Sequence, residues 1–134
     1  MTIKAHLKWT DGLQFVARSG QGPAVILDSS DGASGASPMQ LVLMGVAGCT
    51  AIDVVVILKK KRLALSDFEI EIEGEQAREN PKRYTNISIT YVLTGTGIKP
   101  KAVEQAIELS ETKYCSALAS MNARVEHTYR IVET

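Results

Sequence analysis

The chain is poor in the residues that mark several common classes of protein. Its 134 residues include only two cysteines, two histidines and one tryptophan, and 15 basic side chains are balanced by 15 acidic ones. A balanced charge gives no bulk attraction to nucleic acid or to an anionic membrane surface. We therefore expect neither nucleic acid nor a membrane as partner, and we expect selectivity to come from a pocket.

An export signal is also lacking, because the opening residues MTIKAHLKWT contain no continuous apolar stretch. We therefore expect a cytoplasmic protein. In a reducing compartment, two cysteines are expected to be free thiols and not a structural disulfide. They are then either inert core residues, the commonest fate of free cysteine, or redox groups.

The sequence does contain one long apolar run, and it predicts a single helix from Ser37 to Arg62. Ser37 suits the N-cap position, Pro38 suits the first turn, and the basic residues that end the run suit a helix C-terminus. The run is apolar on nearly all sides, so a membrane span is the rival interpretation. Asp53 argues against it, because a carboxylate at the bilayer centre costs about 2.5 to 3.5 kcal/mol.

Two glycines on this helix predict a close neighbour. Gly45 and Gly48 lower helix stability, and they are best explained by another backbone that approaches them closely. The helix is also too apolar for one modest sheet to cover. We therefore expect this helix to be the buried central helix of an obligate, intertwined homodimer.

The remaining segments predict an α+β arrangement in one domain that spans residues 1–134. Strands are expected over Thr2 to Trp9, Leu13 to Ala17, Ala24 to Leu27, Asp67 to Ala77, Tyr84 to Thr94 and Val125 to Val132, and a second helix over Lys101 to Lys113. The first three strands should form an antiparallel meander and the next two a hairpin. The aromatic residues on these strands are expected in the core first and as pocket lining second: Trp9, Phe15, Phe68, Tyr84 and Tyr91.

The two cysteines are the main candidates for chemistry. Cys115 follows the second helix and precedes a short helical segment, and a helix N-terminus favours a thiolate. Cys49 lies in an apolar mid-helix position, where a thiol needs a nearby cation to ionise. Arg18 is the best candidate for that cation and Lys113 is the second.

Other candidate residues predict structural roles. Asp53 lies four residues after Cys49, on nearly the same helix face, and its charge would oppose a thiolate there. We therefore expect Asp53 to be a hydrogen-bonding residue of the core or of an interface. His6 and His127 lie on predicted strands, and they lack the spacing of metal-ligand pairs, so no metal site is expected.

Two motifs carry a family resemblance. The run SPMQLVLMGVAGCTAIDVVVILKKK, together with KYCSA at Lys113 to Ala117, resembles the OsmC/Ohr family of osmotically inducible and organic-hydroperoxide-resistance proteins, most closely its short YhfA-like branch. The resemblance covers nearly the whole chain. It implies antiparallel sheets wrapped around a long buried central helix in an intertwined dimer, with Cys49 as peroxidatic thiolate, Cys115 as resolving thiol and Arg18 as the family's supporting arginine.

The resemblance has two departures. Family members carry asparagine, proline and glutamate before the helix, whereas this chain has Ser37, Pro38 and Met39, followed by Gln40. The proline that usually follows the resolving cysteine is Ser116 here. The dithiol is therefore kept, while the carboxylate that supports the first thiolate is missing.

The expected function is a thiol-dependent peroxidase that reduces hydrophobic organic hydroperoxides in oxidative or osmotic stress defence. A sulfenic acid on Cys49 would condense with Cys115, and an external dithiol would restore both without any cofactor. In the family this reductant is typically a lipoylated protein. The alternatives are a non-catalytic small-molecule-binding or stress-associated dimer, which the missing glutamate favours, and a general redox partner for protein disulfides.

Overall fold

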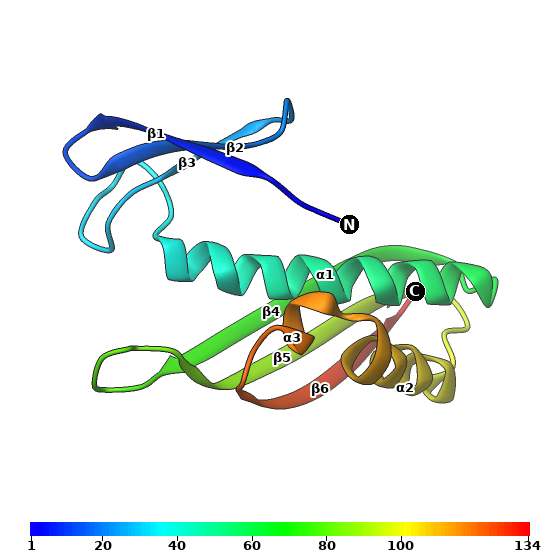
Figure 1. The fold of residues 1–134 in the computed structure, drawn as a ribbon. Helices are drawn as coiled ribbons and strands as arrows, with labels where there is room; N and C mark the ends of the chain where they lie inside the picture. Colours follow the sequence, from blue (N-terminus) through cyan, green and yellow to red (C-terminus); the bar gives the residue numbers. More distant parts are fainter. The chain divides into compact units, whose positions relative to one another are not determined.

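The N-terminal part of the chain forms a small sheet. The computed structural model describes residues 1–134, which fall into two compact units, Met1–Val42 and Leu43–Thr134. The first unit contains β1 (Ala5–Asp11), β2 (Gln14–Ser19) and β3 (Ala24–Leu27), paired antiparallel in that order (Figure 1). The predicted meander is confirmed. The expectation of a single domain over residues 1–134 stays a prediction.

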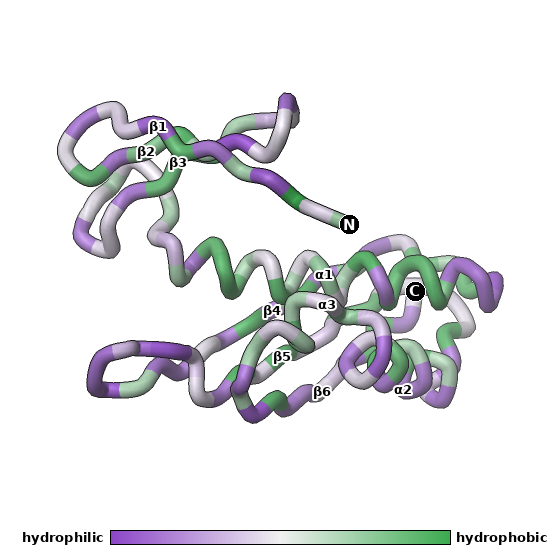
Figure 2. The backbone as a smooth tube through the Cα atoms, viewed as in Figure 1, coloured by the Kyte–Doolittle hydropathy of each residue, from purple (hydrophilic) through white to green (hydrophobic).

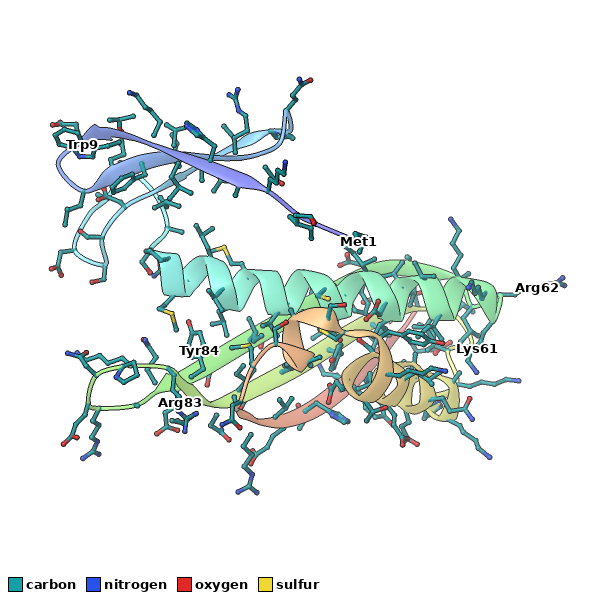
Figure 3. All side chains as sticks on the ribbon, in the orientation of Figure 1. Met1, Trp9, Lys61, Arg62, Arg83 and Tyr84 are labelled. Carbon is teal, nitrogen blue, oxygen red and sulfur yellow. The ribbon has the colours of Figure 1, made fainter.

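Side chains of this sheet are largely exposed. Trp9, labelled in Figure 3, keeps 62% of its surface accessible, and its indole Nε1–H donates to the Gly12 carbonyl at 2.8 Å. The expectation that Trp9 lies in the core is wrong for the single chain. A three-stranded sheet has no second layer of its own, so apolar residues on it stay open until another surface covers them.

The long helix α1 (Pro38–Lys60) begins with a capping box. The Gln40 N–H donates to the Ser37 hydroxyl at 3.2 Å, and the Ser37 N–H donates to the Gln40 side-chain oxygen at 2.9 Å. Two backbone donors at the helix start are thus satisfied reciprocally, which confirms Ser37 as the N-cap. At the other end Arg62 adopts a left-handed φ of 61°, and Figure 3 shows Lys61 and Arg62 at this end of the helix.

The second unit is built on a mixed sheet. Its elements are the rest of α1, β4 (Leu65–Gln76), β5 (Tyr84–Gly95), α2 (Pro100–Leu109), a π-helical turn η1 (Ser110–Tyr114), α3 (Ser116–Ala119) and β6 (Arg124–Glu133). β4 and β5 are antiparallel as predicted, whereas β6 runs parallel to β5 and departs from the expected all-antiparallel sheets. The parallel pairing follows from the helical crossover between β5 and β6. Figure 1 shows α1 lying along this sheet.

One face of the β4–β6 sheet carries the core. Ile87, Ile89, Tyr91 and Leu93 alternate along β5 and are at most 1% exposed. The opposite face of β4 presents three exposed glutamates, Glu69, Glu71 and Glu73, as its alternating pattern predicts. The core is therefore a single layer between this sheet face and the helices.

α1 meets this core through one stripe only. Its buried residues Val46, Thr50, Val54 and Leu58 recur every four positions, the spacing of one helix face. Figure 2 shows hydrophobic colouring along much of the helix, and Ile52 is 66% exposed. By length and composition alone α1 could cross a membrane, a property shared by core helices of soluble proteins.

The predicted close approach at the two helix glycines is not found within the chain. A Cβ atom placed on Gly45 or Gly48 would meet no atom within 4 Å. The expectation of a fully buried central helix is likewise not met by one chain, because a single sheet covers only one side of a helix.

The capping box gives a stability prediction. Ser37→Ala removes the hydroxyl that accepts the Gln40 N–H, so it should lower the free energy of unfolding by about 1 kcal/mol in urea titration. Ser30→Ala, at an exposed loop position, is the control and should leave the midpoint unchanged. Equal midpoints for the two variants would contradict the capping role.

Candidate functional site: a pair of neighbouring thiols

The structure brings the two cysteines together. Cys49 and Cys115 are both free thiols, and their sulfur atoms lie within 4.8 Å of each other. Both belong to one apolar cluster, in which Val46 and Leu118 are buried with Cys115, and in which Cys49 and Ile72 are among the half-buried residues packed against it. A disulfide needs the sulfurs to close to about 2.05 Å. Cys115 lies between two short helical segments and has an extended backbone.

The ionisation of Cys115 differs from the sequence-based expectation. Burial, with a smaller contribution from the neighbouring Cys49, raises the pKa of the Cys115 thiol to about 11. The backbone N–H groups of Leu118 and Ala117 act in the opposite direction but do not outweigh burial. The prediction that the helix N-terminus gives Cys115 a thiolate is therefore wrong, because desolvation dominates at this position.

A π-helical turn sets the position of Cys115. The Cys115 N–H donates to the Ser110 carbonyl five residues back at 2.7 Å, which widens the turn after α2. As a result Ser110 is fully buried, while Leu109 is 38% exposed. The helix predicted to end at Lys113 is thus present, but its last turn is of the π type, a feature often found at functional sites.

Buried hydroxyl groups lie next to the dithiol. The Thr50 hydroxyl is 2.9 Å from the Tyr91 hydroxyl and 2.8 Å from the Ser110 hydroxyl. Ser110 in turn donates to Asp53 Oδ2 at 2.9 Å. An oxygen of Asp53 lies within 4.8 Å of both sulfur atoms. Asp53 is therefore the hydrogen-bonding residue that the sequence predicts, and its partner is a serine of the π turn.

The same hydroxyl chain continues toward the surface. Tyr91 donates to Glu111 Oε2 at 2.7 Å, and Glu111 Oε1 lies 2.9 Å from His127 Nδ1. Burial raises the pKa of Tyr91 well above its usual range, so its hydroxyl remains a donor. His127 is thus a satisfied histidine, as expected, and its partner is a carboxylate.

A cavity of about 250 Å³ lies beside Asp53. Its lining includes the apolar Val56 and Ile57, together with Lys60 and Tyr114. Tyr114 immediately precedes Cys115, so the cavity adjoins the segment that carries the second thiol. An apolar group of a small molecule could occupy this space.

The two predicted cations belong to different units of the structure. Arg18 is an exposed residue of β2 in the first unit, paired in register with His6 and Ala24, and its role stays a prediction. Lys113 lies in the π turn, where its Nζ atom is 5.3 Å from the centre of the Tyr114 ring.

Four residues of the hydroxyl chain were not singled out as site candidates by sequence reasoning. Thr50, Ser110 and Glu111 lie in helical segments, where a polar side chain does not by itself indicate a site. Tyr91 is expected only in the core or as pocket lining. One available signal was Thr50, a polar residue next to Cys49 on a helix that is otherwise almost wholly apolar.

Both the sequence and the fold are similar to those of known proteins. The OsmC-like protein family model matches residues 30–130. The chain belongs to the OsmC-like protein family. This OsmC-like chain is 38% identical to Protein YhfA of Escherichia coli over 132 residues, which cover 97% of the chain and 98% of YhfA. The resemblance stated from the two cysteine motifs is confirmed.

Solved structures agree with this assignment. A hypothetical protein from Aquifex aeolicus is 32% identical, with a TM-score of 0.84 and coverage of 99% of both chains. An organic hydroperoxide resistance protein OsmC from Legionella pneumophila shares the fold, with 16% identity, a TM-score of 0.69, and coverage of 100% of this chain and 98% of that one. The α+β fold class is therefore confirmed. Membership of the OsmC-like family supports a stress-related redox protein.

The burial of Cys115 gives a prediction for thiol reactivity. At pH 8 a thiol with a pKa of about 11 is ionised to roughly one part in a thousand, so iodoacetamide should modify Cys115 very slowly in the reduced protein. The rate, followed by peptide mass spectrometry, should rise about tenfold per pH unit up to that pKa. The urea-unfolded chain is the control. Equal Cys115 rates in folded and unfolded protein at pH 8 would contradict the effect of burial.

Proposed function

We propose that this OsmC-like protein is a thiol-dependent peroxidase that reduces organic hydroperoxides through a Cys49/Cys115 dithiol-disulfide cycle. The observation that carries the proposal is the pair of free thiols within 4.8 Å of each other in one apolar cluster. The name of the Legionella relative, an organic hydroperoxide resistance protein, supports the substrate class. We assign the protein to oxidative or osmotic stress defence in the cytoplasm.

The two cysteines take different parts in this cycle. The Cys49 thiolate attacks the terminal peroxide oxygen, the O–O bond breaks, and the alkoxide takes a proton and leaves as alcohol. Cys49 is thereby oxidised to a sulfenic acid. Cys115 then forms the S–S bond as the S–O bond breaks and water leaves. Two electrons and two protons from an external dithiol restore both thiols, and no cofactor is needed.

The raised pKa of Cys115 supports this order. A thiol that stays protonated near neutral pH is a poor first nucleophile, so we assign the first attack to Cys49. Arg18 is the proposed cation that stabilises the Cys49 thiolate. The reductant is proposed to be a lipoyl-type dithiol, either free or attached to a protein.

The cavity beside Asp53 supports an apolar substrate. Val56 and Ile57 would contact an alkyl or aryl group, and a volume of about 250 Å³ suits a small organic hydroperoxide. Hydrogen peroxide would leave this apolar lining unused, so we expect bulky hydroperoxides to be preferred.

A non-catalytic binding protein is the second candidate. The family's helix-start glutamate is replaced by Met39, and the neighbouring Gln40 uses its side-chain oxygen to accept the Ser37 N–H. The start of α1 therefore supplies a capping amide where a carboxylate is expected. A binding protein of this kind would keep the fold and leave both thiols unoxidised by hydroperoxide.

The active form is proposed to be an intertwined homodimer. The exposed side of α1 presents Gly45, Gly48, Ile52 and Val55 at helical spacing, and the two glycines leave room for a backbone to approach. Burial of such an apolar stripe is a strong drive for association. A second copy of the chain is the partner that these residues favour.

Cysteine variants test the peroxidase. Cys49→Ser should abolish consumption of cumene hydroperoxide in the presence of dihydrolipoamide, because the first nucleophile is lost. Cys115→Ser should consume one equivalent and then slow, because no disulfide can form within the chain. The xylenol-orange assay measures the remaining peroxide. Equal consumption by wild type and both variants would reject the cycle, and no consumption by wild type would favour the binding protein.

A charge on the exposed stripe tests the dimer. Ile52→Lys places an ammonium group in the proposed interface and should convert dimers to monomers or to unfolded chains, as measured by light scattering after gel filtration. Leu109→Lys, at an exposed apolar position on α2, is the matched control and should stay dimeric. A monomeric wild type, or a dimeric Ile52→Lys variant, would overturn the assignment of the stripe.

A further inference from the structure

Three buried hydroxyl groups connect two carboxylates in a continuous chain. Ser110 is 2.9 Å from Asp53 Oδ2 and 2.8 Å from Thr50, Thr50 is 2.9 Å from Tyr91, and Tyr91 is 2.7 Å from Glu111 Oε2. Thr50, Tyr91 and Ser110 are fully buried, at 0% exposure. Every contact therefore has hydrogen-bond length, in a place where a missing hydrogen bond is costly.

A count of hydrogens shows that this chain is one proton short when both carboxylates are ionised. Three hydroxyls supply three hydrogens for four contacts, and an ionised carboxylate can only accept. Ser110 then donates to Asp53 and Tyr91 donates to Glu111, which leaves Thr50 to serve only one of its two neighbours. One added proton completes all four bonds.

The added proton has two equivalent places. On Asp53, every donor in the chain points toward Glu111; on Glu111, every donor points toward Asp53. The two arrangements differ by a concerted shift of four hydrogens, each along its own hydrogen bond, and by no heavy-atom movement. The chain can thus hold one proton and present it at either end.

The two ends differ in what they face. The Asp53 end has an oxygen within 4.8 Å of the sulfur atoms of Cys49 and Cys115, and Lys60 lines the same cavity. The Glu111 end meets His127, whose side chain is 39% exposed and can exchange protons with solvent. The chain of hydroxyl groups therefore runs from the neighbourhood of the dithiol to the surface.

We propose that Asp53 is the proton acceptor and donor of the dithiol, and that Ser110, Thr50, Tyr91 and Glu111 form the relay that holds its proton. This inference rests on the proposed peroxidase cycle. In the first step the Cys49 thiolate attacks the peroxide, and Asp53 gives its stored proton to the alkoxide, which leaves as alcohol, so that Asp53 becomes ionised. In the second step the ionised Asp53 takes the Cys115 proton as the S–S bond forms, and it gives that proton to the departing hydroxide, which leaves as water. When the external dithiol restores both thiols, the Cys49 proton returns to Asp53.

The relay also accounts for two features of the site. Cys115 is buried with a raised pKa, so its proton must be removed as it reacts, and Asp53 is within reach. The carboxylate that Met39 and Gln40 do not supply at the helix start is thus provided from within α1, four residues after Cys49. Here Asp53 is a catalytic residue, while Thr50, Ser110, Tyr91 and Glu111 are positioning residues.

The first test measures the proton itself and needs no peroxidase activity. In infrared spectra of the reduced protein at pH 7, wild type should show the C=O band of one protonated carboxylic acid, which shifts in D₂O. Asp53→Asn should lose the band, because the amide supplies the missing hydrogen. Tyr91→Phe should lose it too, because two hydroxyls then satisfy the two remaining contacts. A wild type without the band, or an Asp53→Asn variant that keeps it, would overturn the relay.

The second test measures the rate of disulfide formation after one equivalent of cumene hydroperoxide. Asp53→Asn should be slower by about 100-fold, as for loss of a general acid and base. Tyr91→Phe should be slower, and it should also lose the effect of D₂O on the rate that wild type shows. A purely structural role of Tyr91 would leave this solvent isotope effect in place. Rates and isotope effects equal to those of wild type would overturn the catalytic part.

Tyr129→Phe is the matched control for both tests. Its hydroxyl donates to Glu104 at 2.6 Å on the same sheet face, outside the chain of hydroxyls. It should keep the infrared band, the rate and the isotope effect, and loss of the band in this variant would overturn the assignment to Asp53. A wild type that forms no disulfide with peroxide would reject the peroxidase, while the infrared result would still decide the relay.

Discussion

Thr50 is the residue on which the site depends, because its buried hydroxyl joins α1 both to the sheet and to the π turn. It lies 2.9 Å from Tyr91 on β5 and 2.8 Å from Ser110, at the start of the segment that carries Cys115. These contacts fix the rotation of α1 and so the direction of the neighbouring Cys49. Without them, the apolar stripe of Val46, Val54 and Leu58 would hold the helix on the sheet but would specify its rotation less sharply, because apolar packing is not directional.

The burial of Cys115 beside Cys49 also determines the chemistry of Cys115. A thiol removed from water resists ionisation, and for Cys115 this effect exceeds the favourable backbone N–H groups near it. The site therefore combines one thiol that resists ionisation with a carboxylate close to both sulfurs. An ionised Asp53 would repel a thiolate nearby, so the proton store proposed at Asp53 is consistent with the thiolate proposed at Cys49.

Much of the fold could be predicted from the sequence, because its patterns are local. Ser37 as N-cap, the strand periods and the charged outer face of β4 all follow from short-range rules. The parallel pairing of β6 and the π turn at Ser110 could not be predicted, since both depend on how α2 packs. The expected burial of Trp9 and of α1 is not found in the single chain. An apolar sequence predicts that a surface will be buried, but it does not show whether the same chain or another one buries it.

The candidate site was predicted in part for the same reason. Cys49 and Cys115 stood out through motif resemblance, and Asp53 through its spacing from Cys49. The hydroxyls of Thr50, Tyr91 and Ser110 come from three separate elements, so no spacing in the sequence links them. Peptide mapping after one equivalent of cumene hydroperoxide tests the central claim most directly. The account predicts a single cross-linked peptide pair containing Cys49 and Cys115, whereas two unmodified thiols, or sulfinic acid on Cys49 with Cys115 still free, would contradict it.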